Sequence, residues 1–421
     1  MQCEPASTPL AHSDAMLVRS LVFYLEYPLP IDAKFLIKDF RLAVNETIRI
    51  GLCSKVTSRY SLSKLAYKDL RKEHPNMYAK HLVSAFEVAG GILKNHRRML
   101  RKGRARNVPY VRRLFMKAEN QAYKLDRENG IVDLPIRAGL HVKLKLVMSD
   151  YHRRYLCDDS ISLGSLTLLP DKVIVAIRKH PPKQYDPESI LSLDTNERSL
   201  DGVLAKDGDL DAVRAEFPEV STIQERHHAR RRKLQKKKSH DRRTSKRLCA
   251  REGGREHHRI DYRLHEVANA VLKLAKERKS KIVLEDLSEM RPRWSKRSKN
   301  MNRRISVWPR RKLHQIIEYK AEWLGIPVVK VDPSYSSRRC PVCGRIQDSR
   351  KGADFSCVCG WRINRHINAS INLLRTAAPE AAGGLRFDPG AFQHDVVMVL
   401  CGPDKAARPE PNGTSGIRAI A

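Results

Sequence analysis

The sequence lacks the long apolar stretches of a membrane protein. No apolar run reaches the roughly 18 residues that indicate a membrane helix, and no basic segment precedes an apolar one in the first 16 residues. We therefore expect no membrane partner, no secretion and a cytoplasmic location.

Acidic residues are scarce relative to basic ones. The 421 residues contain 47 Asp and Glu against 81 Lys and Arg, a net charge of +34, while 41% hydrophobic residues indicate a globular protein. A surface this cationic attracts polyanions, whose counterions are released on binding. Nucleic acid is therefore the expected partner.

Cysteines are too few and too unevenly spaced for a disulfide framework. There are nine, an odd number, and four of them lie between Cys340 and Cys359. Cys340-Pro-Val-Cys343-Gly and Cys357-Val-Cys359-Gly offer four thiolates to one tetrahedral site, and the glycines allow the backbone to turn tightly around the sulfurs. We predict structural Zn²⁺ at these four cysteines, in a reducing compartment. An iron–sulfur cluster or unligated buried cysteines are the alternatives.

The positive charge is concentrated in two segments. Residues 225–310 hold 29 Lys and Arg against 10 Asp and Glu, or +19, and residues 36–126 hold 21 against 7, or +14. Basic runs and interspersed tryptophans are typical of grooves that hold nucleic acid, although a solvated helix face or core packing of Trp308 is the alternative. The predicted nucleic-acid contacts are Arg230, Arg231, Arg232, Lys236, Lys237, Lys238, Trp294, Arg303 and Arg304.

The hydrophobic pattern predicts two kinds of structure in succession. A strand-like run near residues 21–27 is followed by a helical pattern, and alternating residues near 140–146 and 172–178 indicate strands again. After a proline-rich linker, strands ending at Asp194, Lys206, Glu285 and Val331 alternate with basic helical stretches and a helix near 310–324. We predict a small β domain interrupted by helices, followed by an α/β nuclease-like sheet.

Two carboxylates stand at the ends of apolar strands. Asp194 closes Ile-Leu-Ser-Leu, and Glu285 closes Lys-Ile-Val-Leu. Parallel neighbouring strands bring such ends together, and adjacent carboxylates are stable mainly when a divalent cation or a shared proton neutralises them. Mg²⁺ held there can promote phosphodiester hydrolysis. Taken singly, each acid is also compatible with a capping or turn role.

Over about residues 17–376 the sequence closely resembles the TnpB family. The resemblance rests on the two acids and the four cysteines, together with Val331-Asp-Pro-Ser-Tyr-Ser-Ser-Arg-Arg before the cysteines and Asn364-Arg-His366-Ile-Asn368-Ala after them. TnpB proteins are encoded by prokaryotic insertion sequences and are related to compact type V CRISPR effectors. The resemblance implies a multidomain α+β protein. Its expected parts are a flexible start (1–16), a wedge-like β-barrel domain (17–35 and 127–186), a helical recognition insertion (36–126), an RNase H-like (RuvC) nuclease domain (187–338 and 361–376), an inserted zinc ribbon (339–360) and a disordered tail (377–421).

The resemblance also implies an activity. A TnpB protein uses a guide RNA from the transposon end to pair with double-stranded target DNA, reads a short flanking DNA motif, and cuts with Mg²⁺ at a RuvC-like site. The basic segments suit a channel for an RNA–DNA hybrid, which can be held through its backbone. Asp194 is then the first catalytic acid and Glu285 the second.

The sequence departs from the family at the third acid. The family pattern is Asp-Arg-Asp-x-Asn-Ala, whereas Asn364 and His366 stand at the two acidic positions here. His366 can replace the acid as a metal ligand, because neutral imidazole binds metals; Asp332 or Asp354 can reach the metals instead; or the protein binds DNA without cutting it. A DNA transposase is a further alternative. We expect an endonuclease with Asp194, Glu285 and His366 as its catalytic set.

Overall fold

The computed structural model describes residues 16–104, 107–236, 242–287, 302–303, 307–347, 352, 354–380 and 397–401. The described residues form two compact units: an N-terminal unit that ends at Pro181 and a C-terminal unit that begins at Pro182. Residues 1–15 of the predicted flexible start and most of the predicted tail lie outside the described residues. No helix in the described ranges is long and apolar enough to cross a bilayer.

The N-terminal unit contains two antiparallel sheets. One has the order β1-β7-β6-β2 and the other the order β3-β4-β5. An isolated antiparallel bridge pairs Leu25, which follows β1, with Leu146, which follows β5, and so links the two sheets. The predicted β domain is thus present as two sheets, and its closure into a barrel stays a prediction. The strands are β1 (Leu17–Tyr24), β2 (Met116–Ala118), β3 (Lys124–Asp126), β4 (Ile131–Arg137), β5 (Leu140–Lys145), β6 (Ser162–Leu168) and β7 (Lys172–Lys179).

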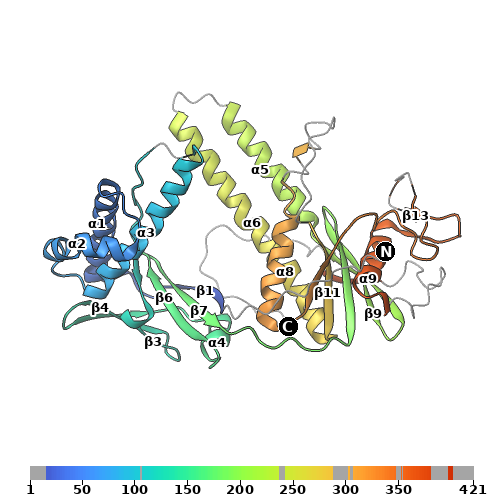
Figure 1. Ribbon diagram of the computed structural model, residues 1–421, viewed down its shortest axis with the longest axis horizontal. Coiled ribbons are helices and arrows are strands. Elements are labelled where there is room, and N and C mark those ends of the chain that lie inside the picture. Colours follow the sequence, from blue (N-terminus) through green and yellow to red (C-terminus); the bar gives the residue numbers. More distant parts are fainter. Residues whose placement is uncertain are drawn as a thin grey trace, which may run out of the picture. The chain divides into compact units, whose positions relative to one another are not determined.

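Three helices are inserted between β1 and β2. They are α1 (Ile31–Cys53), α2 (Arg59–Glu73) and α3 (Ala79–Arg101), and they pack together through buried residues such as Phe40 and Phe86 (Figure 1). The predicted insertion, 36–126, is wrong at both ends. Pro30 is the N-cap of α1 and does not end a strand region, and residues 116–126 return to β2, a short 3-10 turn (Asn120–Ala122) and β3. Three-residue strands are too short to show alternation. A short helix, α4 (Asp150–Leu156), precedes β6.

The C-terminal unit is built on a six-stranded mixed sheet with the order β12-β11-β8-β9-β10-β15. Strands β8, β9 and β10 form an antiparallel meander, whereas β11 pairs in parallel with both β8 and β12. The predicted α/β sheet is therefore present, and β8 and β11 are the neighbours that the two acids required. The strands are β8 (Ser189–Thr195), β9 (Ser199–Lys206), β10 (Asp209–Glu216), β11 (Ser280–Glu285), β12 (Val328–Val331) and β15 (Val397–Cys401).

Helices cover both faces of this sheet (Figure 1). One face packs through Leu191, Leu193 and Ile282 against α5 (Pro218–Lys236), α6 (Arg242–Glu277) and α8 (Arg310–Leu324). The other face packs through Val203 and Ala205 against α9 (Arg365–Ala377) and the cysteine-bearing segment, which includes the hairpin β13 (Asp354–Ser356) and β14 (Arg362–Asn364). Because the central strands are buried from both sides, their ends are held rigidly.

Candidate active site and metal centre

The two predicted acids meet at one edge of the sheet. Asp194 and Glu285 are at the carboxyl ends of β8 and β11 and are 8% and 9% exposed. Burial, the negative charge of Asp194 and a hydrogen bond with that side chain raise the pKa of Glu285 well above its ordinary value. The raised pKa favours the protonated form of Glu285 in the absence of a cation. A pair of this kind has the charge to bind a divalent cation once the proton leaves.

His366 completes the group from the other face of the sheet. It lies in the first turn of α9, where the Asn364 side chain accepts a hydrogen bond from its backbone N–H, and its Nδ1 is 2.9 Å from Asp194 Oδ2. Arg365 Nε donates to His366 Nε2 at 3.3 Å, so a neutral ring carries its proton on Nδ1 and donates it to Asp194. The structure therefore brings all three predicted residues together around Asp194.

A cavity of about 380 Å³ opens beside the two acids. Its wall includes Trp308, Arg310 and the segment 333–337. Among the described residues that line it, neither Asp332 nor Asp354 occurs. Asp332 is exposed and accepts hydrogen bonds from the backbone and hydroxyl of Ser334, and Asp354 is exposed in β13. These two alternative acids therefore do not form part of the cavity wall.

Serines that the sequence did not single out fix α9 to the sheet. Ser370 Oγ accepts from the backbone N–H of Asp194 at 3.2 Å and donates to the carbonyl of Asp201 at 2.7 Å, while Ser192 Oγ donates to the Ser370 carbonyl. Ser370 follows His366 by four residues and therefore shares its helix face. That spacing is the only sequence signal that associates Ser370 with the site.

A buried histidine supports the same strand end. His314 Nε2 of α8 is 2.6 Å from Thr195 Oγ1. Burial, followed by the charges of Lys330 and Arg310, lowers the pKa of His314 to about 4, so the ring is neutral. Its contact with Thr195 spans 119 residues of sequence, and no local pattern indicates it.

Asp201 is a buried acid close to the site that the sequence also did not single out. It lies opposite Asp194 in the β8–β9 pair, but its carboxylate accepts hydrogen bonds from Arg214, Asn196 and Ser199. These donors neutralise and satisfy it, which indicates a structural role.

The four cysteines form a group that could hold one metal ion. Their sulfurs all lie within 4.8 Å of one another, with Cys340–Cys359 at 3.6 Å and Cys343–Cys357 at 3.5 Å. Tetrahedral zinc with Zn–S bonds of about 2.3 Å requires sulfurs roughly 3.8 Å apart, so the group fits Zn²⁺. Among the described residues it is the only group of three or more Cys, His, Asp and Glu side chains this compact.

Backbone geometry around the sulfurs agrees with the predicted tight turns. Gly344 and Gly360 have φ of +74° and +93°, values that favour glycine. The backbone N–H of Cys359 lowers the pKa of Cys357 to about 7, whereas burial raises the pKa of Cys340 to about 12. N–H groups directed at sulfur stabilise thiolate ligands.

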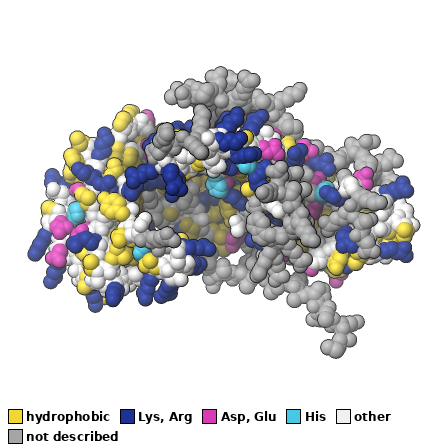
Figure 2. Space-filling view, turned by 90° about the horizontal axis from the view of Figure 1, so that it is seen from above, with side chains coloured by type: hydrophobic (Ala, Val, Ile, Leu, Met, Phe, Trp, Pro, Cys, Tyr) yellow, Lys and Arg dark blue, Asp and Glu magenta, His cyan; other side chains and the backbone are white. Residues whose placement is uncertain are grey.

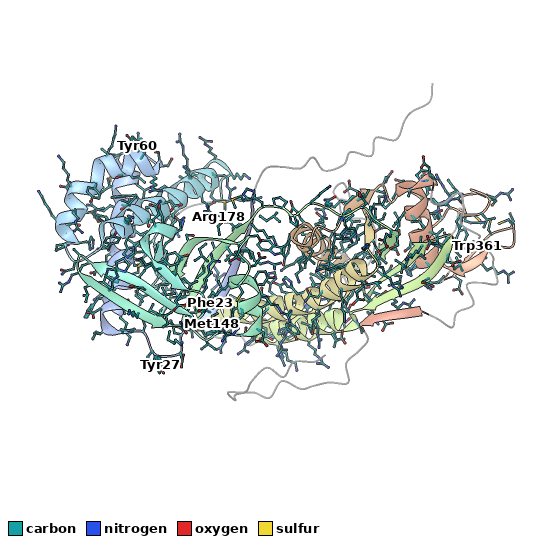
Figure 3. All side chains as sticks on the ribbon, turned by 90° about the horizontal axis from the view of Figure 1, so that it is seen from below. Phe23, Tyr27, Tyr60, Met148, Arg178 and Trp361 are labelled. Carbon is teal, nitrogen blue, oxygen red and sulfur yellow. The ribbon has the colours of Figure 1, made fainter. Side chains whose placement is uncertain are left out.

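The metal centre is joined to α9 by an indole and two amides. Trp361, labelled in Figure 3, is 1% exposed, and its Nε1 donates to Asn368 Oδ1 at 3.2 Å. Asn368 and Asn372 both donate to the carbonyl of Arg339, the residue before Cys340. The cysteine-bearing segment is therefore held against the same helix that carries His366.

Only some of the predicted nucleic-acid contacts lie in the described ranges, and two of these pair with acidic residues. Arg230 pairs with Glu252 at 3.3 Å and Arg231 pairs with Glu256, so the α5–α6 hairpin uses part of their charge internally. Arg232 and Lys236 lie on α5, and Arg303 is partly buried. Burial and the charges of Arg303, Arg231 and Arg232 lower the pKa of His228, which places these guanidinium groups near one another. The remaining predicted residues lie outside the described ranges: Lys237, Lys238, Trp294 and Arg304.

The second basic segment lies in the N-terminal unit. On the face drawn in Figure 2, Lys and Arg side chains line the outer edge of the part that carries α1, α2 and α3, with hydrophobic groups between them. The last turn of α3 alone contributes Arg98 and Arg101. This surface has the charge expected for a polyanion contact.

Comparisons with known proteins agree with this architecture. The family model described as "Cas12f1-like, TNB domain" matches residues 311–373, which include α8, the cysteines and most of α9, and the "Uncharacterized protein MJ0013 family" matches residues 36–133. The TnpB-like protein MJ0751 of Methanocaldococcus jannaschii is 31% identical over 241 residues, which cover 56% of this chain and 86% of that protein. The chain belongs to the TnpB family.

This TnpB protein is also similar to CRISPR effectors. The CRISPR-associated endodeoxyribonuclease Cas12f1 of Sulfoacidibacillus thermotolerans is 36% identical over 113 residues, 26% of this chain and 25% of that protein. A cryo-EM structure of a Cas12f1–sgRNA–target DNA complex matches 85% of this chain and 98% of its own with a TM-score of 0.56 and 12% identity. The TnpB chain therefore has the same overall fold as that effector.

Proposed function

We propose that this TnpB protein is an RNA-guided, metal-dependent DNA endonuclease. The observation that carries the proposal is that Asp194 and Glu285 line a cavity of about 380 Å³ and that His366 contacts Asp194, on a sheet of antiparallel and parallel strands typical of RuvC-like nucleases. Membership of the TnpB family and the fold shared with Cas12f1 support it. Its partners are a guide RNA from the transposon end and double-stranded target DNA.

The site residues divide the work as follows. Asp194 and Glu285 are the carboxylate ligands, and Mg²⁺ bound to them would supply an electrophile for the phosphate and activate water. His366 positions Asp194 through the Nδ1 hydrogen bond and stands where the family has its third acid. Arg310, whose charge opposes the raised pKa of Glu285, provides a fixed positive group next to the acids.

The remaining parts hold the substrates. The C-terminal unit, with Arg232 and Lys236 on α5, contacts the RNA–DNA hybrid, and the N-terminal unit, through its sheets and α1 to α3, reads the flanking DNA motif. The zinc ribbon supports the wall of the active site. Contacts made mainly to phosphates make such binding strongly dependent on salt.

A second function is favoured by one specific observation. Asp194 is already satisfied by His366 and Glu285, and these three do not belong to a described group whose ligand atoms all lie within 4.8 Å. An RNA-guided protein that binds DNA without cutting it does not need Asp194, Glu285 and His366 to lie close enough together to share a metal ion. A transposase has no such supporting observation.

The two functions are separated by binding and cleavage measured on the same complex. RNA that copurifies with the protein is sequenced, and a DNA duplex matched to its guide portion is presented next to a randomised flank. Guide-dependent binding in EDTA followed by strand breaks in Mg²⁺ supports the endonuclease. Tight binding with intact DNA supports the non-cutting protein, and the absence of a bound guide RNA contradicts both.

A further inference from the structure

Two aromatic rings, each stacked with an arginine, border the acidic cavity. The Arg310 guanidinium lies 4.9 Å from the centre of the Trp308 ring, and that of Arg338 lies 5.7 Å from the centre of the Tyr335 ring. Trp308, Arg310 and Tyr335 line the same cavity as the two carboxylates. The rings come from segments on either side of α8 in the sequence, so the fold assembles them at one place.

Tyr335 is held in a conformation that its residue type disfavours. Its φ is +61°, in the left-handed region where a side chain is strained, and its ring is 50% exposed. The surrounding turn is fixed, because the N–H groups of Arg338 and Arg339 both donate to the Tyr335 carbonyl at 2.9 Å. A glycine fits this backbone better, so packing of the turn gives no reason for the aromatic ring. Strain retained at a cavity wall points to a role in function.

We propose that Tyr335 and Trp308 stack on bases of one unpaired DNA strand, on the two sides of the phosphate that lies at Asp194 and Glu285. The inference rests on the proposed function, because it assigns the residues that select the strand entering that site. Aromatic faces bind bases of any sequence once the bases are unstacked, and they cannot do so with bases inside a duplex. Arg310, which lies over the Trp308 ring and lines the same cavity, can donate to an adjoining phosphate, whereas the Nε of Arg338 already donates to the Gln347 carbonyl at 2.7 Å.

The stacks have a matched counterpart away from the site. Tyr262, on α6, is 63% exposed and has the Arg263 guanidinium 5.8 Å from its ring centre. It is not among the described residues that line the cavity. This pair has the same chemistry and similar exposure. Substituting Tyr262 therefore shows the effect of losing any exposed tyrosine, and substituting Tyr335 shows the effect of losing one at the cavity.

Fluorine NMR on the full chain labelled with 5-fluorotryptophan tests the proposal without cleavage. The protein has four tryptophans, and Trp308→Phe identifies the Trp308 signal by its loss. A thymidine tetranucleotide, which has bases on both sides of its central phosphate, is titrated in EDTA. We expect the Trp308 signal to shift with the tetranucleotide and to remain in place with a tetramer of abasic nucleotides, which has the same phosphates.

Variants complete the test. Tyr335→Gly is expected to weaken tetranucleotide binding at the Trp308 signal about tenfold, the loss of one stacked base, with an unchanged thermal midpoint, whereas Tyr335→Phe and Tyr262→Gly bind like the wild type. An equal Trp308 shift with the abasic tetramer, or unchanged binding by Tyr335→Gly, overturns the proposal. If the Trp308 signal responds as expected but neither the wild type nor any variant cuts guided DNA, stacking stands and the endonuclease function fails. If guided DNA is cut without the Trp308 response, the endonuclease function stands and stacking fails.

Discussion

At the scale of single residues, the unusual feature is an imidazole where the family has a carboxylate. His366 donates its Nδ1 proton to Asp194 at 2.9 Å and is fixed in the first turn of α9 by the Asn364 cap. A hydrogen-bonded neighbour of this kind orients a metal ligand, and losing one typically costs about 10–100-fold in activity or metal affinity. Under the proposed function, His366 therefore sets how well Asp194 is placed.

Substitution of His366 tests this directly. We expect His366→Ala to lower the single-turnover rate of guided DNA cleavage by about 10–100-fold, because Asp194 loses its positioning contact. His366→Asp restores a carboxylate and is expected to cut faster than the wild type in Mg²⁺, a cation that prefers oxygen ligands. His258→Ala, at an exposed position on α6, is the control. Equal rates for His366→Ala and wild type would exclude His366 from the site.

A second histidine makes the N-terminal unit sensitive to acid. His81 is fully buried in α3 with Nε2 2.7 Å from the Pro135 carbonyl, and burial lowers its pKa to about 4. The unfolded chain binds this proton near pH 6.5 and the folded chain does not, so the contribution to stability is complete above pH 6.5 and is lost as the pH falls toward 4. The difference corresponds to about 3 kcal/mol.

Urea unfolding at pH 7 and pH 4.5, followed by circular dichroism, measures this effect. We expect the transition of the N-terminal unit to shift to lower urea at pH 4.5 in the wild type and to shift less in His81→Asn. His258→Gln, which changes an exposed ring, should keep the wild-type pH dependence. A transition in His81→Asn with the full wild-type pH dependence would show that another group is responsible.

Sequence reasoning found some of the site residues and missed others for one physical reason. Asp194, Glu285 and the cysteines stand in local patterns, a strand end or a tight pair, that carry their chemistry with them. Ser370, His314 and Trp361 act through partners distant in the sequence or on another element; the spacing of Ser370 from His366 is the one signal near them, and the surroundings of His314 and Trp361 contain none. Only the folded chain brings such pairs together.

At the scale of elements, the site depends on a close approach between β8 and β9. A Cβ added at Gly202 would lie 2.3 Å from the Ser192 carbonyl oxygen and 2.6 Å from Leu193 Cδ2, in the two residues that precede Asp194. Backbone cannot move away cheaply, so Gly202→Ala is expected to reduce the free energy of unfolding by about 2 kcal/mol. At Gly253 in α6 nothing lies within 4 Å of the added atom, and alanine there should be neutral or stabilising.

Thermal unfolding compares the two glycine variants. We expect Gly202→Ala to melt several degrees below the wild type and Gly253→Ala to melt at or above it. Equal midpoints for the two variants would mean that the β8–β9 contact is not as tight as described.

The cysteine-bearing element should contain one metal ion per chain. Cys357→Ser removes a thiolate from the set of four, and we expect it to lose zinc and to lower the thermal midpoint, because Trp361, Asn368 and the loop before Cys340 lose their support. Zinc content by mass spectrometry checks the first effect and calorimetry the second. Cys249→Ser, on α6 outside the group, should keep one zinc; full zinc in Cys357→Ser would contradict a four-cysteine site.

Elements with a long pattern were predicted closely, and short ones were not. The helix at 310–324 and the strand ending at Glu285 agree with α8 and β11, because several buried residues define each period. Strands β2 and β3 have three residues each, and half of the eight residues of β10 are charged, so none of these strands has a hydrophobic pattern that stands out. Pro30 was ambiguous because proline both ends strands and begins helices.

At the scale of the whole molecule, most of the positive charge and the proposed reactive groups lie in different parts of the chain. The net charge of +34 arises mainly from the helical segments, whereas the acids and the zinc centre are on the sheet and α9. Under the proposed function, the positive charge holds the polyanion and the small acidic site cuts the phosphodiester. Binding should therefore survive the loss of the acids.

The comparison of wild type with Asp194→Ala, each loaded with its guide RNA, tests the account most directly. DNA matched to the guide is mixed with both proteins in Mg²⁺, and strand breaks and binding are measured together. We predict that the wild type cuts, and that Asp194→Ala binds the same DNA with equal affinity and leaves it intact. Intact DNA with the wild type at saturating binding, or cleavage by Asp194→Ala at the wild-type rate, would contradict an endonuclease centred on Asp194.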